Sequence, residues 1–451
     1  MSKTLIVLFV VSLLLCPFVS AITVEQPAFE PMDTLSGLSN SEAGSMMQLL
    51  QQETSSSFSF TWGTPSSIEL GNGILLAQDG SIYTIGAVAD GGYYDLLLIK
   101  WDDKGNRLWN RTWGYSSHDW GNSIAEASDG TIYTVGYTNP VDTISRKQDL
   151  LLVKWDTDGV QLWNRTWGDL DYDYGNDLVI GKDGSIYTVG TLFSGDIHRL
   201  ILLKWDSEGN LVWSRTHGQS SDLWGRYLAT DASNNIYTLE NLGHSFVLVK
   251  WNPNGNEVWS HSETDVEATG MVVGKYGDVF VVGMWAGLYI GRWTPNGIKV
   301  WERDWISVDM DSCWGKDLVI GTDENIYAVG MAQSSGIEEQ TATVVKWDSE
   351  GTYLGHWIWE TTFYHRIEAA TIDNQNHIYL VGYVENRSEN EMPSDNDLLV
   401  VIYFNSEMTS VSYITYARGF HMGSELLVTI LTLCSVCLLI LLTKRRKNSV
   451  N

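Results

Sequence analysis

Short apolar runs separated by turn residues recur along most of the chain and predict β-strands. An Asp-Gly turn followed by an Ile-Tyr-Thr-Val type of run occurs at 79–86, 129–136 and 183–190. Four weaker copies are centred on Tyr237, Phe280, Tyr327 and Tyr379. The aromatic positions lie 50, 54, 50, 43, 47 and 52 residues apart, a period that suits a four-stranded propeller blade better than a helical repeat. The seven copies predict seven blades.

A second signature follows each copy of the first: an apolar run, Lys-Trp-Asp, a Gly turn and another Trp. Its clearest copy spans 149–163 and contains Trp155, Gly159 and Trp163. Continuous apolar runs such as 150–153 predict strands that are buried on both faces, as between neighbouring blades. The Trp rings are expected to fill the wedge between the blades, and the Asp-Gly pairs to form hairpin turns.

These units resemble the SBBP family of seven-bladed β-propeller repeats, found in secreted and surface proteins of prokaryotes. The resemblance rests on the Asp-Leu-Leu-Leu-Val-Lys-Trp-Asp motif at 149–156 with Gly159 and Trp163, and it covers about residues 58–416. It implies a fold and says little about chemistry. The predicted fold class is all-β, a seven-bladed β-propeller with an N-terminal signal peptide and one C-terminal transmembrane helix.

Two segments compete to close the predicted ring. Residues 58–63 imitate the last strand of a blade ahead of the first repeat, and residues 411–416 offer a further strand after the last repeat. One of them must complete blade seven, and the sequence leaves the choice open.

Both ends of the chain predict contact with a membrane. Lys3, the apolar run 5–15 and the small residues at 20–21 predict a cleaved signal peptide, with an uncleaved anchor as the alternative. The uncharged run 426–443 precedes the basic cluster 444–447, which predicts a transmembrane helix with a cytoplasmic C-terminus. A buried core helix is the alternative there. The expected location is a cell membrane, crossed once, with the propeller outside.

The predicted domains follow from these boundaries. They are a signal peptide at 1–21, a disordered lead or stalk at 22–57, the propeller at 58–416, a juxtamembrane linker at 417–425, the transmembrane helix at 426–443 and a basic tail at 444–451.

The net charge of −27 argues against nucleic acid as a partner, because such a surface repels phosphate backbones. Of the four cysteines only Cys313 falls within the predicted propeller, where a small buried side chain is expected. The nine histidines show no metal-ligand spacing and no place in a nucleophile motif, and phosphate-binding glycine loops are missing. We therefore predict no cofactor, no metal and no catalytic residues.

The candidate site follows from loop lengths. The connections between the second and third strands of each unit vary, whereas the hairpin turns are nearly constant, and variation on a fixed scaffold marks the face that is free to bind. Counting back eleven residues from each second-strand aromatic gives one polar residue per blade. These residues are Asn72, Asn122, Asn176, Arg226, Thr269, Lys316 and Glu368.

Large side chains stand two residues before this polar ring, among them Trp120, Tyr174, Trp224 and Trp314. Asp119 and Asp173 come one residue further back. Aromatic rings beside amides and acids suit a sugar or a peptide side chain, so we predict a ligand site at the mouth of the central channel. The alternative is that the polar residues only cap strand ends and hydrate the channel.

Asn110, Asn164 and Asn386 begin Asn-x-Ser/Thr triplets and are predicted glycosylation sites. The predicted function is that of a membrane-anchored extracellular module that binds or adheres to a glycan or protein without catalysis. The alternative is a surface polysaccharide hydrolase or lyase that uses carboxylates at the channel mouth, such as Asp119, Asp173 or Glu368.

Overall fold

The computed structural model divides the chain into two units, Met1–Ser55 and Ser56–Asn451. It describes residues 57–403 except for 64–66, 90–91, 115–116, 140–147, 169–170, 286, 307–311, 334–339, 360–363 and 386–395. The first unit lies outside the described residues, as do the predicted signal peptide, the lead, the linker, the helix over 426–443 and the basic tail.

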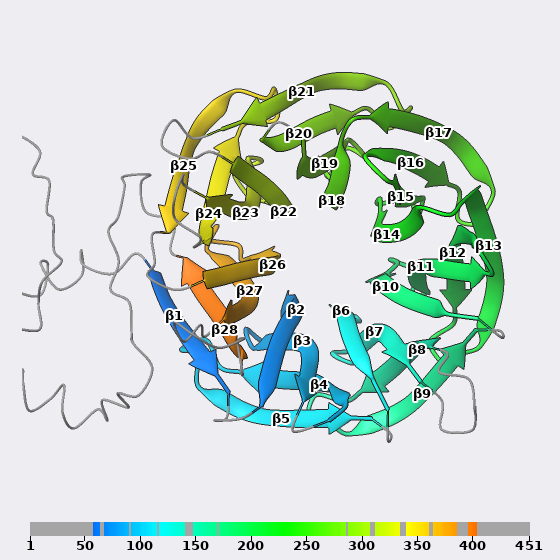
Figure 1. The fold of residues 1–451 in the computed structure, drawn as a ribbon, viewed down its shortest axis with the longest axis vertical. Coiled ribbons are helices and arrows are strands. Elements are labelled where there is room, and N and C mark those ends of the chain that lie inside the picture. The colour runs from blue at the N-terminus through cyan, green and yellow to red at the C-terminus, as the bar shows by residue number, and fades with distance from the viewer. Residues whose placement is uncertain are drawn as a thin grey trace, which may run out of the picture. The chain divides into compact units, whose positions relative to one another are not determined.

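The described strands form seven antiparallel four-stranded sheets around a central axis (Figure 1). Blades 1 to 4 consist of β2 (Ile68–Leu76), β3 (Ile82–Ala89), β4 (Tyr94–Trp101) and β5 (Arg107–Trp113); β6 (Trp120–Glu126), β7 (Ile132–Thr138), β8 (Asp149–Trp155) and β9 (Gln161–Trp167); β10 (Asp173–Ile180), β11 (Ile186–Ser194), β12 (Ile197–Trp205) and β13 (Leu211–Ser220); and β14 (Leu223–Thr230), β15 (Ile236–Leu242), β16 (Ser245–Trp251) and β17 (Glu257–Thr264).

The remaining blades follow the same order. Blades 5 to 7 consist of β18 (Glu267–Val273), β19 (Val279–Met284), β20 (Leu288–Trp293) and β21 (Lys299–Trp305); β22 (Ser312–Ile320), β23 (Ile326–Gln333), β24 (Gln340–Trp347) and β25 (Tyr353–Trp359); and β26 (Tyr364–Ile372), β27 (Ile378–Glu385) and β28 (Asn396–Tyr403) with β1 (Ser57–Trp62).

The ring is closed by the N-terminal segment. Strand β1 pairs antiparallel with β28 over six residues, from the Ser57 and Tyr403 pair to the Trp62 and Leu398 pair, and becomes the outer strand of blade 7. Of the two segments that compete in the sequence, 58–63 therefore takes this place. The other, 411–416, lies outside the described residues.

The fold class expected from the sequence needs correction, because it joined the propeller to a signal peptide and a membrane-spanning helix. The described residues form an all-β propeller alone. Within the part of the chain that the structure describes, no helix has the length and apolar character needed to cross a membrane. The coarser prediction, a β-propeller built from internal repeats, is confirmed.

The repeated signatures explain why each blade holds together. The Trp of Lys-Trp-Asp donates its indole N–H to the Thr of the first signature: Trp155 Nε1 lies 3.0 Å from Thr134 Oγ1, and Trp205 Nε1 lies 3.1 Å from Thr188 Oγ1. Both indoles are almost fully buried. The hydroxyl thus satisfies a donor that would be costly to bury alone, while the ring fills the space between sheets.

The cores lie between neighbouring blades. One cluster combines Ile85 and Leu96 of blade 1 with Ile124, Leu151 and Trp155 of blade 2, and similar clusters follow around the ring. Apolar strands at the centre of each sheet are buried on both faces, as their continuous apolar runs predict.

The two faces of the propeller differ. Five residues connect the first and second strands of every blade, and five connect the third and fourth strands of blades 1 to 6. These hairpins form the turn face. The connections between second and third strands vary from two residues before β16 to ten before β8, and together with the links between blades they form the loop face.

The hairpins of the turn face depend on glycines with positive φ, as predicted. Gly159 has a φ of 75°, and a Cβ there would lie 2.9 Å from the Trp109 ring of the preceding blade, so only glycine fits. In the same turn Asp156 Oδ1 accepts the N–H groups of Asp158 and Val160 at 3.0 Å and 2.8 Å, which is an ordinary Asx turn.

Arginines on the outer strands join consecutive blades. Arg165 Nε donates to the carbonyl of Gly209 in the next blade at 3.0 Å, and its guanidinium lies 4.8 Å from the centre of the Trp163 ring. The same clamp recurs from Arg111 to Gly159, from Arg215 to Gly255 and from Arg303 to Gly351.

Candidate functional site

A β-bulge positions the polar ring predicted from the sequence. In each inner strand the pairing register skips one residue, for example between Gly121 and Ser123. The skipped residues are Asn72, Asn122, Asn176, Arg226, Thr269, Lys316 and Glu368. A bulge bends the strand and re-aims its side chain, so the fold turns all seven toward the channel or the next blade.

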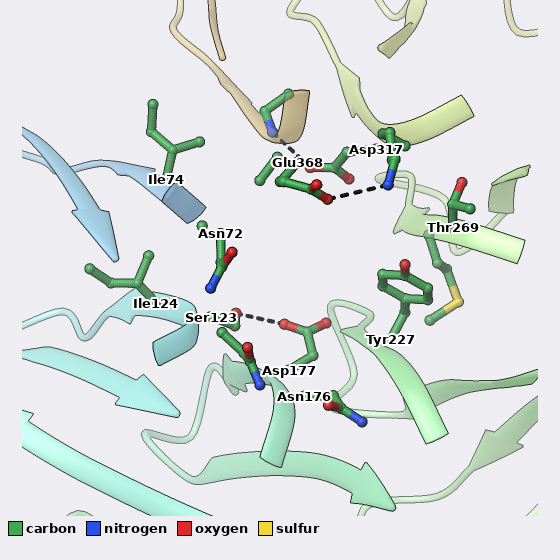
Figure 2. Close-up of a pocket in the computed structure, with 16 residues that line it drawn as sticks. Asn72, Ile74, Ser123, Ile124, Asn176, Asp177, Tyr227, Thr269, Asp317 and Glu368 are labelled. Carbon is green, nitrogen blue, oxygen red and sulfur yellow. Dashed lines mark hydrogen bonds and ion pairs between the residues drawn. The ribbon is translucent and has the colours of Figure 1, made fainter. Parts of the chain in front are cut away.

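A pocket of about 170 Å³ lies within this ring, lined by residues from every inner strand. Figure 2 shows Asn72, Ser123, Asp177, Tyr227, Thr269, Asp317 and Glu368 around it. The structure therefore brings the predicted ring together, and Arg226 joins it in an adjoining cavity.

Three of the ring residues carry a structural load. The Nδ2 groups of Asn72, Asn122 and Asn176 donate to the carbonyls of Gly121, Gly175 and Gly225 in the next blade, at 2.8 Å, 2.8 Å and 2.6 Å. These asparagine latches join consecutive inner strands. Alanine at Asn122 or Asn176 would leave a carbonyl of the next blade without this donor, so such variants test stability as well as binding.

Two buried carboxylates were missed by the sequence reasoning. Asp177 accepts Ser123 Oγ at 2.7 Å and the N–H of Leu228 at 2.9 Å, and Asp317 accepts the N–H of Ala370 at 2.8 Å. Each thus bonds to the inner strand of the following blade. Their signal was present in the sequence, because each acid follows a ring residue directly within an otherwise apolar strand.

Burial makes both acids weak. It raises the pKa of Asp177 to about 6, against the hydrogen bonds from Ser123 and the backbone. Burial, with a smaller contribution from the negative charge of Asp177, raises the pKa of Asp317 to about 7. The unfolded chain releases these protons near pH 4, whereas the folded chain keeps them to about pH 6–7.

The two acids predict that stability falls as pH rises from about 4 to about 7, because the folded state then holds more protons than the unfolded chain. Asp317→Asn removes one titration and should reduce this fall by on the order of 3 kcal/mol, although it weakens the protein at acidic pH by losing one acceptor. Urea unfolding at several pH values measures the profile. Asp102→Asn, in an exposed turn where hydrogen bonds lower the pKa, is the control and should leave this range unchanged. A parallel profile for Asp317→Asn would contradict the assignment.

Charged residues of blades 4 to 7 line a second cavity of about 300 Å³ at the start of the inner strands. We call it the mouth cavity; its charged side chains are Arg226, Glu267, Lys316, Arg366 and Glu368. Glu368 pairs with Lys316 Nζ at 3.3 Å and with Arg366 Nε at 2.6 Å. Arg226 is exposed, and its guanidinium lies 5.2 Å from the centre of the Trp224 ring.

Aromatic rings of blades 1 to 4 form a continuous cluster on the loop face. We call it the aromatic belt; its members are Tyr94, His118, Trp120, Tyr137, Tyr174, Phe193, His198 and Trp224. Trp120 stacks on Tyr137 with 6.1 Å between ring centroids, and Tyr137 meets Tyr174 edge to face at 5.0 Å. All eight are partly exposed.

The belt contains three of the four predicted aromatics. Trp120, Tyr174 and Trp224 belong to it, whereas Trp314, half-buried on β22, shares none of its ring contacts among the described residues. Tyr137, Phe193 and His198 were missed, because they lie beside the variable loops, outside the repeated positions.

The acids proposed for the enzyme alternative are corrected by the structure. Asp119 and Asp173 are completely buried, and Asp119 accepts the hydroxyl of Thr138. Cys313 occupies the same repeat position and is also buried, as expected. Asp119 and Asp173 therefore belong to the packing between blades, and of the three named acids only Glu368 lines the channel pocket.

Two of the predicted glycosylation sites fall within the described residues. Asn110 and Asn164 are half-buried on the outer strands β5 and β9, and Asn386 lies outside the described residues. Glycosylation at all three stays a prediction. No group of three or more His, Cys, Asp or Glu side chains able to hold a metal occurs among the described residues.

No known protein family matches the chain, and no curated protein is a detectable relative. Solved structures share the fold at low identity. The Dos1 propeller has 12% identity and a TM-score of 0.46, and the match covers 76% of this chain and 81% of that one. Polysaccharide lyase Uly1 has 10% identity and a TM-score of 0.47, with 76% and 92% covered. A Bacteroides caccae protein of unknown function has 13% identity and a TM-score of 0.40, with 65% and 94% covered.

The fold and these comparisons define the chain as a β-propeller repeat protein. The likenesses concern the fold alone, and membership of the SBBP family is not confirmed by them. The ligand has to be argued from the side chains of the site.

Proposed function

We propose that this propeller binds a saccharide chain across the aromatic belt of its loop face, without catalysis. The observation that carries the proposal is the row of partly exposed rings over four consecutive blades, beside a polar channel mouth. The sequence places glycans and proteins alike among the partners, and the belt favours the glycan.

The shape of the belt supports a chain of sugars. The C–H faces of sugar rings are flat and apolar and pack on aromatic faces, while their hydroxyls need hydrogen-bonding groups at the edge. Rings spaced along several blades provide successive stacking surfaces, and the channel mouth provides charged and amide groups. A peptide would use the same rings through isolated side chains.

The enzyme alternative has less support. Asp119 and Asp173 are buried, and Glu368 is held between Lys316 and Arg366. Glycoside hydrolysis needs two carboxyl groups on either side of the bond that breaks. Glu368 is the one acid of that alternative on the channel pocket, so the observed arrangement favours binding.

Display outside a cell, one membrane-spanning segment and membership of the SBBP family stay parts of the proposal. They rest on the sequence at 1–21, at 426–447 and in the repeats. A saccharide-binding face held at a cell surface would serve adhesion or recognition.

The aromatic belt can be tested with Trp120→Ala. Trp120 touches Tyr94 and Tyr137 at the centre of the belt, so its loss should weaken saccharide binding by about 1–3 kcal/mol while the protein stays folded. A glycan array identifies the saccharide, and calorimetry measures the affinity.

The matched control is Tyr276→Ala, which removes an aromatic side chain that is 74% exposed in a hairpin of the turn face. This variant should bind as the wild type does. Equal affinity for wild type and Trp120→Ala would overturn the proposed role of the belt, as would selective capture of peptides with no saccharide bound.

A further inference from the structure

Blade 4 departs from the repeat at the polar ring. In blades 1 to 3 the bulge residue is an asparagine that donates to the first backbone carbonyl of the following bulge, as Asn176 does to Gly225. In blade 4 the bulge residue is Arg226. The equivalent acceptor in blade 5 is the carbonyl of Ala268.

A different strand supplies the missing latch. Asn241, on β15, donates its Nδ2 to the carbonyl of Ala268 at 2.7 Å and accepts the N–H of Ala268 at 3.2 Å. Asn241 is 5% exposed, so this exchange is built into the interior. It holds blades 4 and 5 together without the bulge residue. Arg226 is therefore released from the structural role that its equivalents have.

Arg226 is placed to meet a ligand. Its side chain is exposed and lines the mouth cavity, and its guanidinium lies 5.2 Å from the centre of the Trp224 ring. The ring faces the guanidinium and limits its freedom, which favours binding of a planar anion through two parallel hydrogen bonds. Trp224 is also the last ring of the aromatic belt, so Arg226 stands where the belt meets the charged half of the mouth.

The mouth cavity has an excess of positive charge in a chain of net charge −27. Arg226, Lys316 and Arg366 are cationic, and Glu267 and Glu368 are anionic. Glu368 serves both Lys316 and Arg366. Glu267 lines the same cavity and opposes an incoming anion, so its charge should limit the affinity.

We propose that the mouth cavity recognises an anionic saccharide, whose carboxylate or sulfate pairs with Arg226 while the sugar ring packs against Trp224. This inference rests on the proposed function and names its ligand class. Lys316 and Arg366 supply further positive potential, and the aromatic belt holds the neighbouring sugars.

The test is an array in which each uronic acid oligosaccharide stands beside its methyl ester, with sulfated and neutral chains of similar length. Calorimetry on the full-length protein then compares wild type with Arg226→Gln, Glu267→Gln and Trp120→Ala. The acid should bind roughly tenfold more tightly than its ester, because it gains a charge-assisted hydrogen bond. Arg226→Gln should remove that preference and leave the ester unaffected, and Glu267→Gln should increase it.

Sulfated chains distinguish the two anions, since preference for sulfate over carboxylate would assign the substituent and still require Arg226. Equal binding of acid and ester, or equal loss of both in Arg226→Gln, would overturn the anionic ligand. If Trp120→Ala still weakens both forms in that case, the proposed function stands without it. Failure of every saccharide to bind would overturn both, and binding of poly-glutamate peptides alone would assign the site to proteins.

Discussion

Truncation of Trp155 to alanine is expected to lower the free energy of unfolding by roughly 3–5 kcal/mol, the cost of deleting a large buried ring. Trp155 is 2% exposed and packs among Ile85, Leu96 and Ile132 between blades 1 and 2. Alanine would open a cavity that the sheets cannot close without shifting against each other. Urea unfolding monitored by far-UV circular dichroism measures the loss.

Two further variants separate the parts of this effect. Thr134→Val keeps the volume of the side chain but removes the acceptor of the Trp155 indole N–H, which should cost about 1–3 kcal/mol. Leu162→Ala, at a site that is 50% exposed on an outer strand, should change stability by less than about 0.5 kcal/mol. If Trp155→Ala unfolds at the same urea concentration as Leu162→Ala, Trp155 does not fill the wedge between the blades.

Removal of β1 is expected to have the largest effect on the ring. A chain that begins at residue 63 lacks the strand that pairs with β28 over six residues. Blade 7 would then expose the edge of β28, and exposed edge strands pair with other chains. We expect loss of a single cooperative thermal transition and the appearance of aggregates in size-exclusion chromatography with light scattering.

The control for this truncation begins at residue 56 and keeps β1 complete. It should melt as the full chain does, because it retains every paired residue of blade 7. Equal melting temperatures and equal monomer content for the two truncated chains would show that closure does not depend on β1.

The strands and turns of each blade were predictable because their determinants are local and repeated. Tyr133-Thr134 and Lys154-Trp155 lie on adjacent strands, and the contacts between them recur in other blades at the same spacing. Ring closure was not predictable in this way. It joins Ser57 to Tyr403, at opposite ends of the repeats, and two apolar segments suited the same place.

The candidate site was predicted in part. The polar ring was found because the bulge recurs at a fixed distance from the second-strand aromatic. Asp119 was misplaced because it comes directly before Trp120, and successive side chains of an extended backbone point to opposite sides. Trp120 lies in the belt, and Asp119 is buried.

The exchange at blade 4 illustrates what a repeat alignment cannot show. Arg226 occupies an asparagine position, and the sequence alone suggests that the latch to blade 5 is lost. Asn241 supplies the donor from a different strand, which becomes visible only when β15 is seen beside β18. Substitutions that compensate across strands carry no signal in the spacing of one repeat.

The asparagine latches and the arginine clamps share a direction with a consequence for how such a chain grows. In each the donor is a side chain of one blade, as in Asn122 or Arg165, and the acceptor is a backbone carbonyl of the next. Every residue has such a carbonyl, so a donor blade requires little of the identity of its neighbour. A duplicated blade therefore brings its own fastening, and the older copy is free to drift, as blade 4 has done at Arg226.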